Sequence, residues 1–171
     1  MYGIHFTGGP MKPGMMRPFP FLIAALTCSF LISCATVPIT GRKTLNLVPA
    51  SELMMMADQQ YAEILKKSKL STDPAKVGLV KKVGSRIAAA SENFMRQTGR
   101  EAQVSNYKWE FNLIEDDETV NAWCMPGGKV AVYTGILPIT QDEAGLAVVV
   151  GHEVAHALAR HGDERMSQQM L

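Results

Sequence analysis

Cysteine is scarce in this sequence, which has three cysteines in 171 residues. Cys28 and Cys34 belong to an apolar N-terminal segment, so Cys124 is the one cysteine in the rest of the chain. A single thiol cannot close a disulfide within the mature domain. We expect Cys124 to be buried, because a lone thiol in an oxidising compartment needs burial or a role. A thiolate ligand to a metal is the alternative.

An excess of charge of one sign is also lacking. The chain has 17 Lys and Arg residues against 16 Asp and Glu residues. It has no basic patch with interleaved aromatic residues, so we expect no nucleic-acid partner. No internal repeat is visible either.

Acidic residues are absent from the first 34 positions. Lys12 and Arg17 precede an apolar stretch, Phe19–Ile32, that is too short for a stable membrane span. A basic region followed by a short apolar region is typical of a secretory signal. The stretch ends in Leu-Ile-Ser-Cys, which resembles the lipobox of bacterial lipoproteins and predicts that Cys34 carries a lipid.

This interpretation divides the chain into a signal peptide at 1–33, a lipidated N-terminus and linker at 34–50, and a folded domain at 51–171. Ala35 follows the cysteine in place of an aspartate, which by resemblance to Gram-negative lipoproteins favours the outer membrane. We therefore expect a protein of the bacterial cell envelope, held to the periplasmic face of the outer membrane by its lipid. An ordinary secretory signal or an N-terminal anchor helix is the alternative.

The middle of the chain alternates between helical and extended patterns. Apolar residues recur at helical spacing over 51–70, with Ser51 as a cap, and over 73–99, where Asp73 is a cap followed by proline. Apolar and polar residues alternate over 107–113, which predicts a half-buried strand, and 129–134 predicts a second strand. The sequence therefore predicts an α+β fold.

The motif His152-Glu153-Val154-Ala155-His156 has the pattern H-E-x-x-H. Histidines at i and i+4 lie on one helical face, so both imidazoles can reach a single Zn²⁺ ion. The glutamate after the first histidine is then placed to deprotonate the attacking water. We therefore predict His152 and His156 as metal ligands and Glu153 as catalytic base of a zinc-assisted hydrolysis, most often of a peptide bond. A polar network in a core helix is the alternative, but a buried carboxylate is costly there without a cation.

The limits of this helix are also predicted. Thr140 and Glu143 form a Thr-x-x-Glu capping box at its start, and Gly162 is the expected stop. Residues 144–159 are apolar almost all round, which predicts a buried helix. His161 is five residues from His156, so we expect it to face away from the metal.

A third zinc ligand is not evident, although catalytic zinc takes three protein ligands. The longer pattern H-E-x-x-H-x-x-G-x-x-H fails, because Ala159 and Gly162 occupy its glycine and final histidine positions. Asp163 and Glu164 follow too closely to fold back onto the metal. We therefore expect the third ligand to be absent from this chain and the C-terminal part of the domain to be missing.

The segment 121–137, NAWCMPGGKVAVYTGIL, together with the H-E-x-x-H motif resembles peptidase family M48. The segment 38–43, PITGRK, is similar to the periplasmic lipoprotein members of that family. The resemblance implies a zincin-like fold of the gluzincin type, with His152 and His156 as zinc ligands and Glu153 as catalytic base. It also implies a third ligand, a glutamate on a later helix.

The expected function is therefore that of a zinc-dependent endopeptidase that hydrolyses misfolded or unassembled envelope proteins. The strand at 129–134 is our candidate for the sheet edge that pairs with an extended substrate, because it directly precedes the metal-binding helix. The alternative is a catalytically inactive lipoprotein that binds clients or assembly factors.

Overall fold

The structure is a computed structural model that describes residues 34–36, 43–45 and 48–162. The signal peptide expected at 1–33 lies outside these residues, as do Asp163 and Glu164. No helix within the described part of the chain is long and apolar enough to cross a membrane. The expected division at 34 and 51 remains a prediction.

The described elements have the α+β composition that the sequence predicts. In chain order they are β1 (Cys34–Thr36), β2 (Lys43–Leu45), α2 (Ala50–Lys67), α3 (Pro74–Gln97), the short 3₁₀ helix η2 (Glu101–Gln103), β3 (Glu110–Ile114), β4 (Ala122–Met125), β5 (Lys129–Tyr133), a second 3₁₀ helix η3 (Thr134–Ile136), α4 (Leu137–Thr140) and α5 (Glu143–Leu158). Strands β1 and β2 pair with each other antiparallel inside the segment expected to be a linker.

Strands β3, β5 and β4 form a three-stranded sheet in that spatial order. The central strand β5 is parallel to β3 and antiparallel to β4. Lys129–Thr134 therefore cannot be the substrate-pairing edge, because β5 is hydrogen-bonded to a neighbour on each side. The prediction was wrong because it missed β4, a short strand joined to β5 by a turn in which Gly127 and Gly128 have φ of +83° and +85°.

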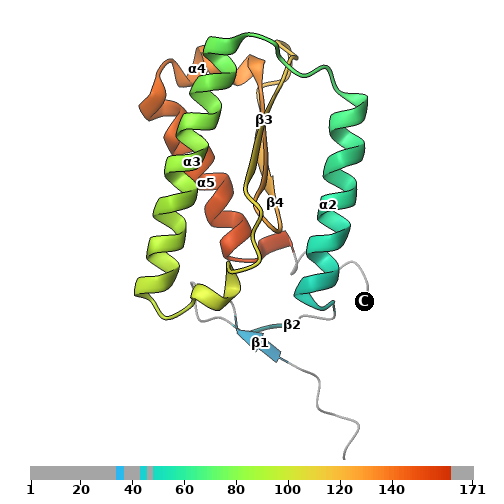
Figure 1. The fold of residues 1–171 in the computed structure, drawn as a ribbon, viewed down its shortest axis with the longest axis vertical. Coiled ribbons are helices and arrows are strands. Elements are labelled where there is room, and N and C mark those ends of the chain that lie inside the picture. The colour runs from blue at the N-terminus through green and yellow to red at the C-terminus, as the bar shows by residue number, and fades with distance from the viewer. Residues whose placement is uncertain (1–33, 37–42, 46–47, 163–171) are drawn as a thin grey trace, which may run out of the picture. The chain divides into compact units, whose positions relative to one another are not determined.

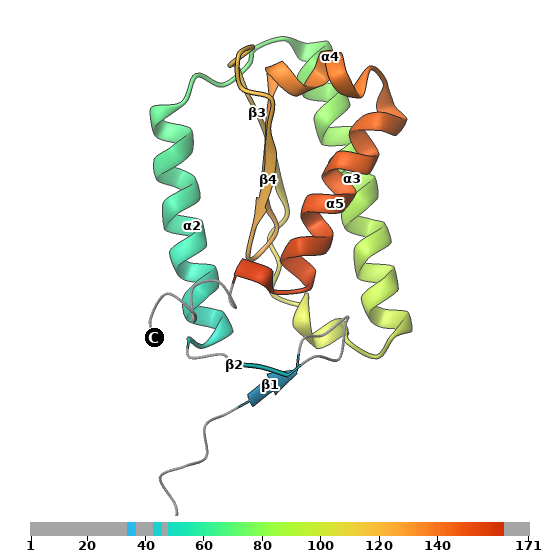
Figure 2. The same cartoon turned by 180° about the vertical axis from the view of Figure 1, so that it is seen from behind.

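Helices cover both faces of the sheet: α3 and α5 lie on one face and α2 lies on the other (Figures 1 and 2). The alternation of side chains along β5 explains how one strand serves both layers. Val130 and Val132 belong to the cluster with α3 and α5, whereas Ala131 belongs to the cluster with Tyr61 of α2. All three β5 residues are fully buried, so the core lies on both sides of this strand.

Polar contacts fix α2 to the sheet. The Tyr61 hydroxyl donates a 2.8 Å hydrogen bond to the carbonyl oxygen of Val130 and accepts one of 3.0 Å from the Asn112 amide. Burial raises the pKa of Tyr61 to about 12, so the phenol keeps the proton that it donates. The buried ammonium of Lys129 lies 3.4 Å from Glu110 and 3.7 Å from Asp58 of α2. These contacts hold α2 in register with β5.

The helix ends follow the predicted signals in part. The Asp73 carboxylate caps α3 by accepting hydrogen bonds from the amides of Ala75 and Lys76, and Gly99 ends the helix with φ +68°. The predicted Asp73 cap is confirmed, and the helix expected over 73–99 matches α3. Ser51 does not cap α2, because the helix begins one residue before it, after Pro49.

Helix α3 approaches the sheet closely at Gly84. A Cβ atom at this position would lie 2.3 Å from the nearest ring carbon of Phe111 on β3. Gly78, six residues earlier on the exposed side of the same helix, has no heavy atom within 4 Å of the corresponding position. Glycine at 84 is therefore a packing requirement, whereas glycine at 78 is not.

We predict opposite effects of alanine at these two glycines. Gly84→Ala lowers the free energy of unfolding by roughly 1–3 kcal/mol, because the Phe111 ring must move. Gly78→Ala, the matched control, raises it by roughly 0.5–1 kcal/mol, because alanine favours the helix and meets no neighbour. Urea unfolding of both variants measures the two changes. Equal effects at the two positions would contradict the packing described for α3 and β3.

Candidate metal centre

The H-E-x-x-H motif lies in the second half of α5. The helix begins at Glu143 after Asp142, whose carboxylate accepts a 2.8 Å hydrogen bond from the amide of Gly145. The predicted capping box was wrong, because Thr140 belongs to α4 and its hydroxyl donates to the carbonyl oxygen of Leu137. Aspartate is as good a cap as threonine, and the two candidates are only two residues apart.

Among the described residues, neighbours cover one face of α5. Leu146, Val150, Val154 and Leu158 recur every four residues and are 0–6% exposed. On the opposite face Val148 is 73% exposed, and His152 and His156 are exposed as well. The prediction of a helix buried all round is therefore confirmed for one face and wrong for the other, within the part of the chain that the structure describes.

The structure brings the two predicted ligands together. The Nε2 atoms of His152 and His156 are 2.9 Å apart, and the ring centroids are 4.4 Å apart with the planes at 85°. Two nitrogens at this distance must share a proton or a cation, because their lone pairs repel. Two imidazole ligands of a tetrahedral zinc ion have nitrogens about 3.3 Å apart, so small side-chain rotations suffice to admit the metal.

His161 does not face away from this pair. Its Nδ1 atom lies 2.7 Å from Nδ1 of His156, on the side of the His156 ring opposite to His152. The prediction assumed that the helix continues to Gly162. Helix α5 instead ends at Leu158, and Arg160 has φ +57°, a left-handed conformation that redirects the chain. Nothing in the sequence marks Arg160 as a residue of that conformation.

Glu153 lies next to β4. The helix α5 packs against this strand, and the Glu153 carboxylate acts electrostatically on the Cys124 thiol of β4. Burial, and then this carboxylate, raises the pKa of Cys124 to about 12. The thiol is therefore protonated at neutral pH in the absence of a metal, and the side chain is half-buried where the sequence predicted burial.

The residues present fit a zinc ion as two ligands and a base. His152 and His156 offer two imidazole nitrogens at adjacent positions, and Glu153, the residue after His152, is half-buried. Within residues 34–36, 43–45 and 48–162 no group of three or more His, Cys, Asp or Glu side chains is arranged to hold a metal. The described residues therefore provide two protein ligands of the three that catalytic zinc takes.

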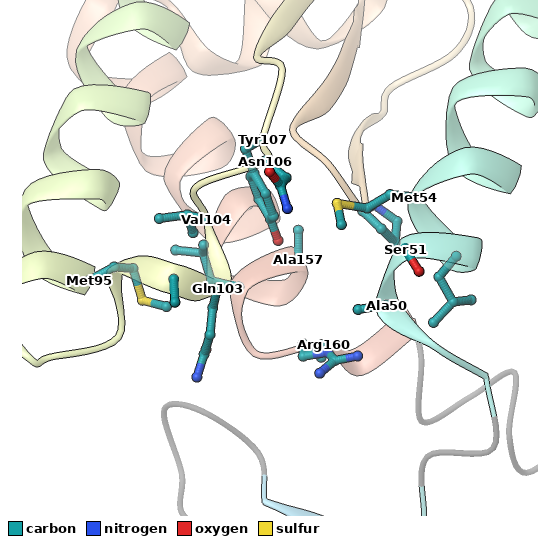
Figure 3. A pocket seen from close by; sticks show the side chains of 14 residues that line it. Ala50, Ser51, Met54, Met95, Gln103, Val104, Asn106, Tyr107, Ala157 and Arg160 are labelled. Atoms are coloured by element: carbon teal, nitrogen blue, oxygen red, sulfur yellow. The ribbon is translucent and has the colours of Figure 1, made fainter.

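A separate pocket of about 250 Å³ lies near the C-terminal end of α5. Side chains from α2, from the region of η2 and from α5 surround it, as Figure 3 shows. Ala157 and Leu158 line the pocket, whereas none of the three motif side chains does. It is therefore separate from the candidate metal centre on the exposed face of the helix.

The chain is similar to one protein family and to several curated proteins. Residues 84–171 match the sequence profile of peptidase family M48. The mitochondrial metalloendopeptidase OMA1 of Schizosaccharomyces pombe is 35% identical over 165 residues, which are 95% of this chain and 45% of that protein. The human metalloendopeptidase OMA1 is 28% identical over 131 residues, 75% of this chain and 24% of that protein.

A bacterial protein is also similar to this chain. The beta-barrel assembly-enhancing protease of Escherichia coli is 26% identical over 153 residues, which are 86% of this chain and 29% of that protein. The chain thus spans less than half the length of these curated relatives.

Proposed function

This chain belongs to peptidase family M48, and on that premise we propose that it forms the metal-binding part of a zinc-dependent endopeptidase. The observation that carries the proposal is the arrangement on α5: two imidazole nitrogens 2.9 Å apart on the exposed face, with Glu153 beside the strand β4. The names of the relatives, which are metalloendopeptidases and a protease, support it.

His152 and His156 would hold the zinc ion through Nε2. A zinc ion in such a site polarises the scissile carbonyl and makes water a stronger acid. The carboxylate of Glu153 accepts the proton of the attacking water and passes it to the leaving amine. Its position one residue after the first ligand keeps it within reach of the same site.

The strand β4 is the sheet edge best placed to receive a peptide. Among the described strands it pairs on one side alone, with β5, and it packs against α5. An extended substrate that adds to β4 would run along α5, because this helix packs against the strand and the Glu153 carboxylate acts electrostatically on Cys124. This edge replaces the strand expected from the sequence.

We further propose that the protein acts in the bacterial cell envelope on misfolded or unassembled proteins. The N-terminal sequence supports this location, since Lys12, Arg17, Phe19–Ile32 and Cys34 have the order of a lipoprotein signal. The name of the Escherichia coli relative, which refers to beta-barrel assembly, supports substrates of that kind.

The predicted lipid at Cys34 is tested by labelling cells with radioactive palmitate. We expect the unaltered protein to take up label and Cys34→Ser to remain unlabelled, because the thiol is the acceptor of the lipid. A labelled Cys34→Ser protein, or an unlabelled parent, would refute the lipoprotein assignment.

The role of Glu153 is tested by Glu153→Gln, which keeps the shape of the side chain and removes the base. In a version of the protein that supplies the third zinc ligand, we expect the zinc content to be unchanged and casein cleavage to fall by roughly 100- to 10,000-fold. Glu143→Gln is the matched control at the start of the same helix. It removes ion pairs of Glu143 with Lys82 and Arg86 that contribute little at the surface, so cleavage should persist.

Undiminished cleavage by zinc-loaded Glu153→Gln would refute the assigned role. Zinc-loaded parent protein that binds casein without cutting it would instead favour the inactive, client-binding lipoprotein. Zinc content and cleavage are therefore measured on the same samples.

A further inference from the structure

The His161 imidazole has no part in the chemistry described above, yet it contacts one of the two ligands. Its Nδ1 atom is 2.7 Å from Nδ1 of His156, and the ring centroids are 4.9 Å apart at 53°. His152 contacts the same ring at its other nitrogen, Nε2. His156 therefore lies between two imidazoles and uses both of its nitrogens.

The protons of these three rings can be arranged in two ways. In one, His161 donates to Nδ1 of His156, and His156 donates from Nε2 to His152. In the other, His156 donates from Nδ1 to His161, and its Nε2 accepts a proton from His152. Only the second arrangement leaves a lone pair on Nε2 of His156, which a metal ligand needs.

We propose that His161 is a positioning residue of the metal centre: its Nδ1 accepts a hydrogen bond from Nδ1 of His156, which keeps Nε2 of His156 free for the metal. Histidine ligands generally donate their second nitrogen to an acceptor, which fixes both the tautomer and the ring orientation. The identity of the metal rests on the proposed function, whereas the hydrogen bond does not.

His161 is not a third ligand to the same ion in this arrangement. The two nitrogens of an imidazole point to opposite sides of the ring, and His161 lies at Nδ1 of His156. A metal held between the Nε2 atoms of His152 and His156 is therefore on the far side of the His156 ring. His161 acts on the metal only through His156.

The backbone after α5 makes this contact possible. A helix that continued past Leu158 would carry position 161 away from position 156, because five residues correspond to about 500° of rotation. The left-handed conformation of Arg160 instead turns the chain back. That conformation is uncommon for a residue with a side chain, so the surrounding structure must hold it.

The tautomer of His156 is the direct test. Long-range ¹H–¹⁵N correlation spectra of the metal-free full chain at pH 8 distinguish a proton on Nδ1 from one on Nε2. We expect His156 to carry its proton on Nδ1, and His161→Leu to shift it toward Nε2. A purely structural role for His161 would lower the stability of the metal-free chain and leave the tautomer of His156 unchanged.

Zinc affinity provides the second readout. Titration with Zn²⁺ alone should show 10- to 100-fold weaker binding for His161→Leu. His161→Asp should restore most of the affinity, since a carboxylate also accepts from Nδ1–H. Val148→Ala, an exposed change on the same helix, is the control and should leave zinc affinity unaltered. Circular dichroism of each metal-free variant shows whether it is folded.

The outcomes separate the two proposals. If the unaltered chain binds no zinc but His161→Leu shifts the His156 tautomer, the positioning role stands and the zinc assignment fails. If zinc binds and neither tautomer nor affinity responds to His161→Leu, the positioning role is refuted and the zinc assignment stands. If His161→Leu is unfolded, the tautomer in folded His161→Asp decides, and a His156 proton on Nε2 there refutes the role.

Discussion

The packing of α5 on the sheet is the constraint on which the rest of the site depends. Burial of Leu146, Val150, Val154 and Leu158 fixes the rotation of the helix about its axis. Each of these side chains contributes about 1.5–3 kcal/mol when fully buried. The histidines at 152 and 156 lie half a turn away from the buried row, so the same packing that stabilises the helix directs both imidazoles outward.

The elements that pack against α5 link its position to the rest of the domain. On one side the close approach of Gly84 to Phe111 lets α3 lie against the sheet and share a core with α5. On the other side the edge strand β4 packs against the helix, and Glu153 acts electrostatically on Cys124 of that strand. The proposed base therefore lies on the helix that packs against the proposed substrate-binding edge, and both positions follow from one packed helix.

Much of this arrangement could be predicted from the sequence, because its strongest signals are local. Helical periodicity, the Asp73 cap and the spacing of His152 and His156 depend on residues a few positions apart, and each gave the right element. The order of the strands could not be obtained in this way. The pattern of Lys129–Tyr133 predicts a strand but not its place in the sheet. Its central position depends on pairing with residues from two other segments.

The contact of His161 was missed for a related reason. Counting residues along an ideal helix assumes that the helix continues, and one left-handed residue, Arg160, changes the direction of everything that follows. The exposure of Val148 was missed because apolar composition predicts burial without saying which neighbour provides it. Both errors concern what surrounds a motif, whereas the motif itself was placed on the correct helix.

X-ray absorption at the zinc edge of the zinc-loaded chain tests the central claim most directly. The account predicts nitrogen or oxygen neighbours at about 2.0–2.1 Å and outer-shell scattering from two imidazole rings. The imidazole signal should disappear in the double variant His152→Ala, His156→Ala. A sulfur neighbour at about 2.3 Å, or a zinc spectrum that the double variant leaves unchanged, would contradict the assignment of the metal centre to α5.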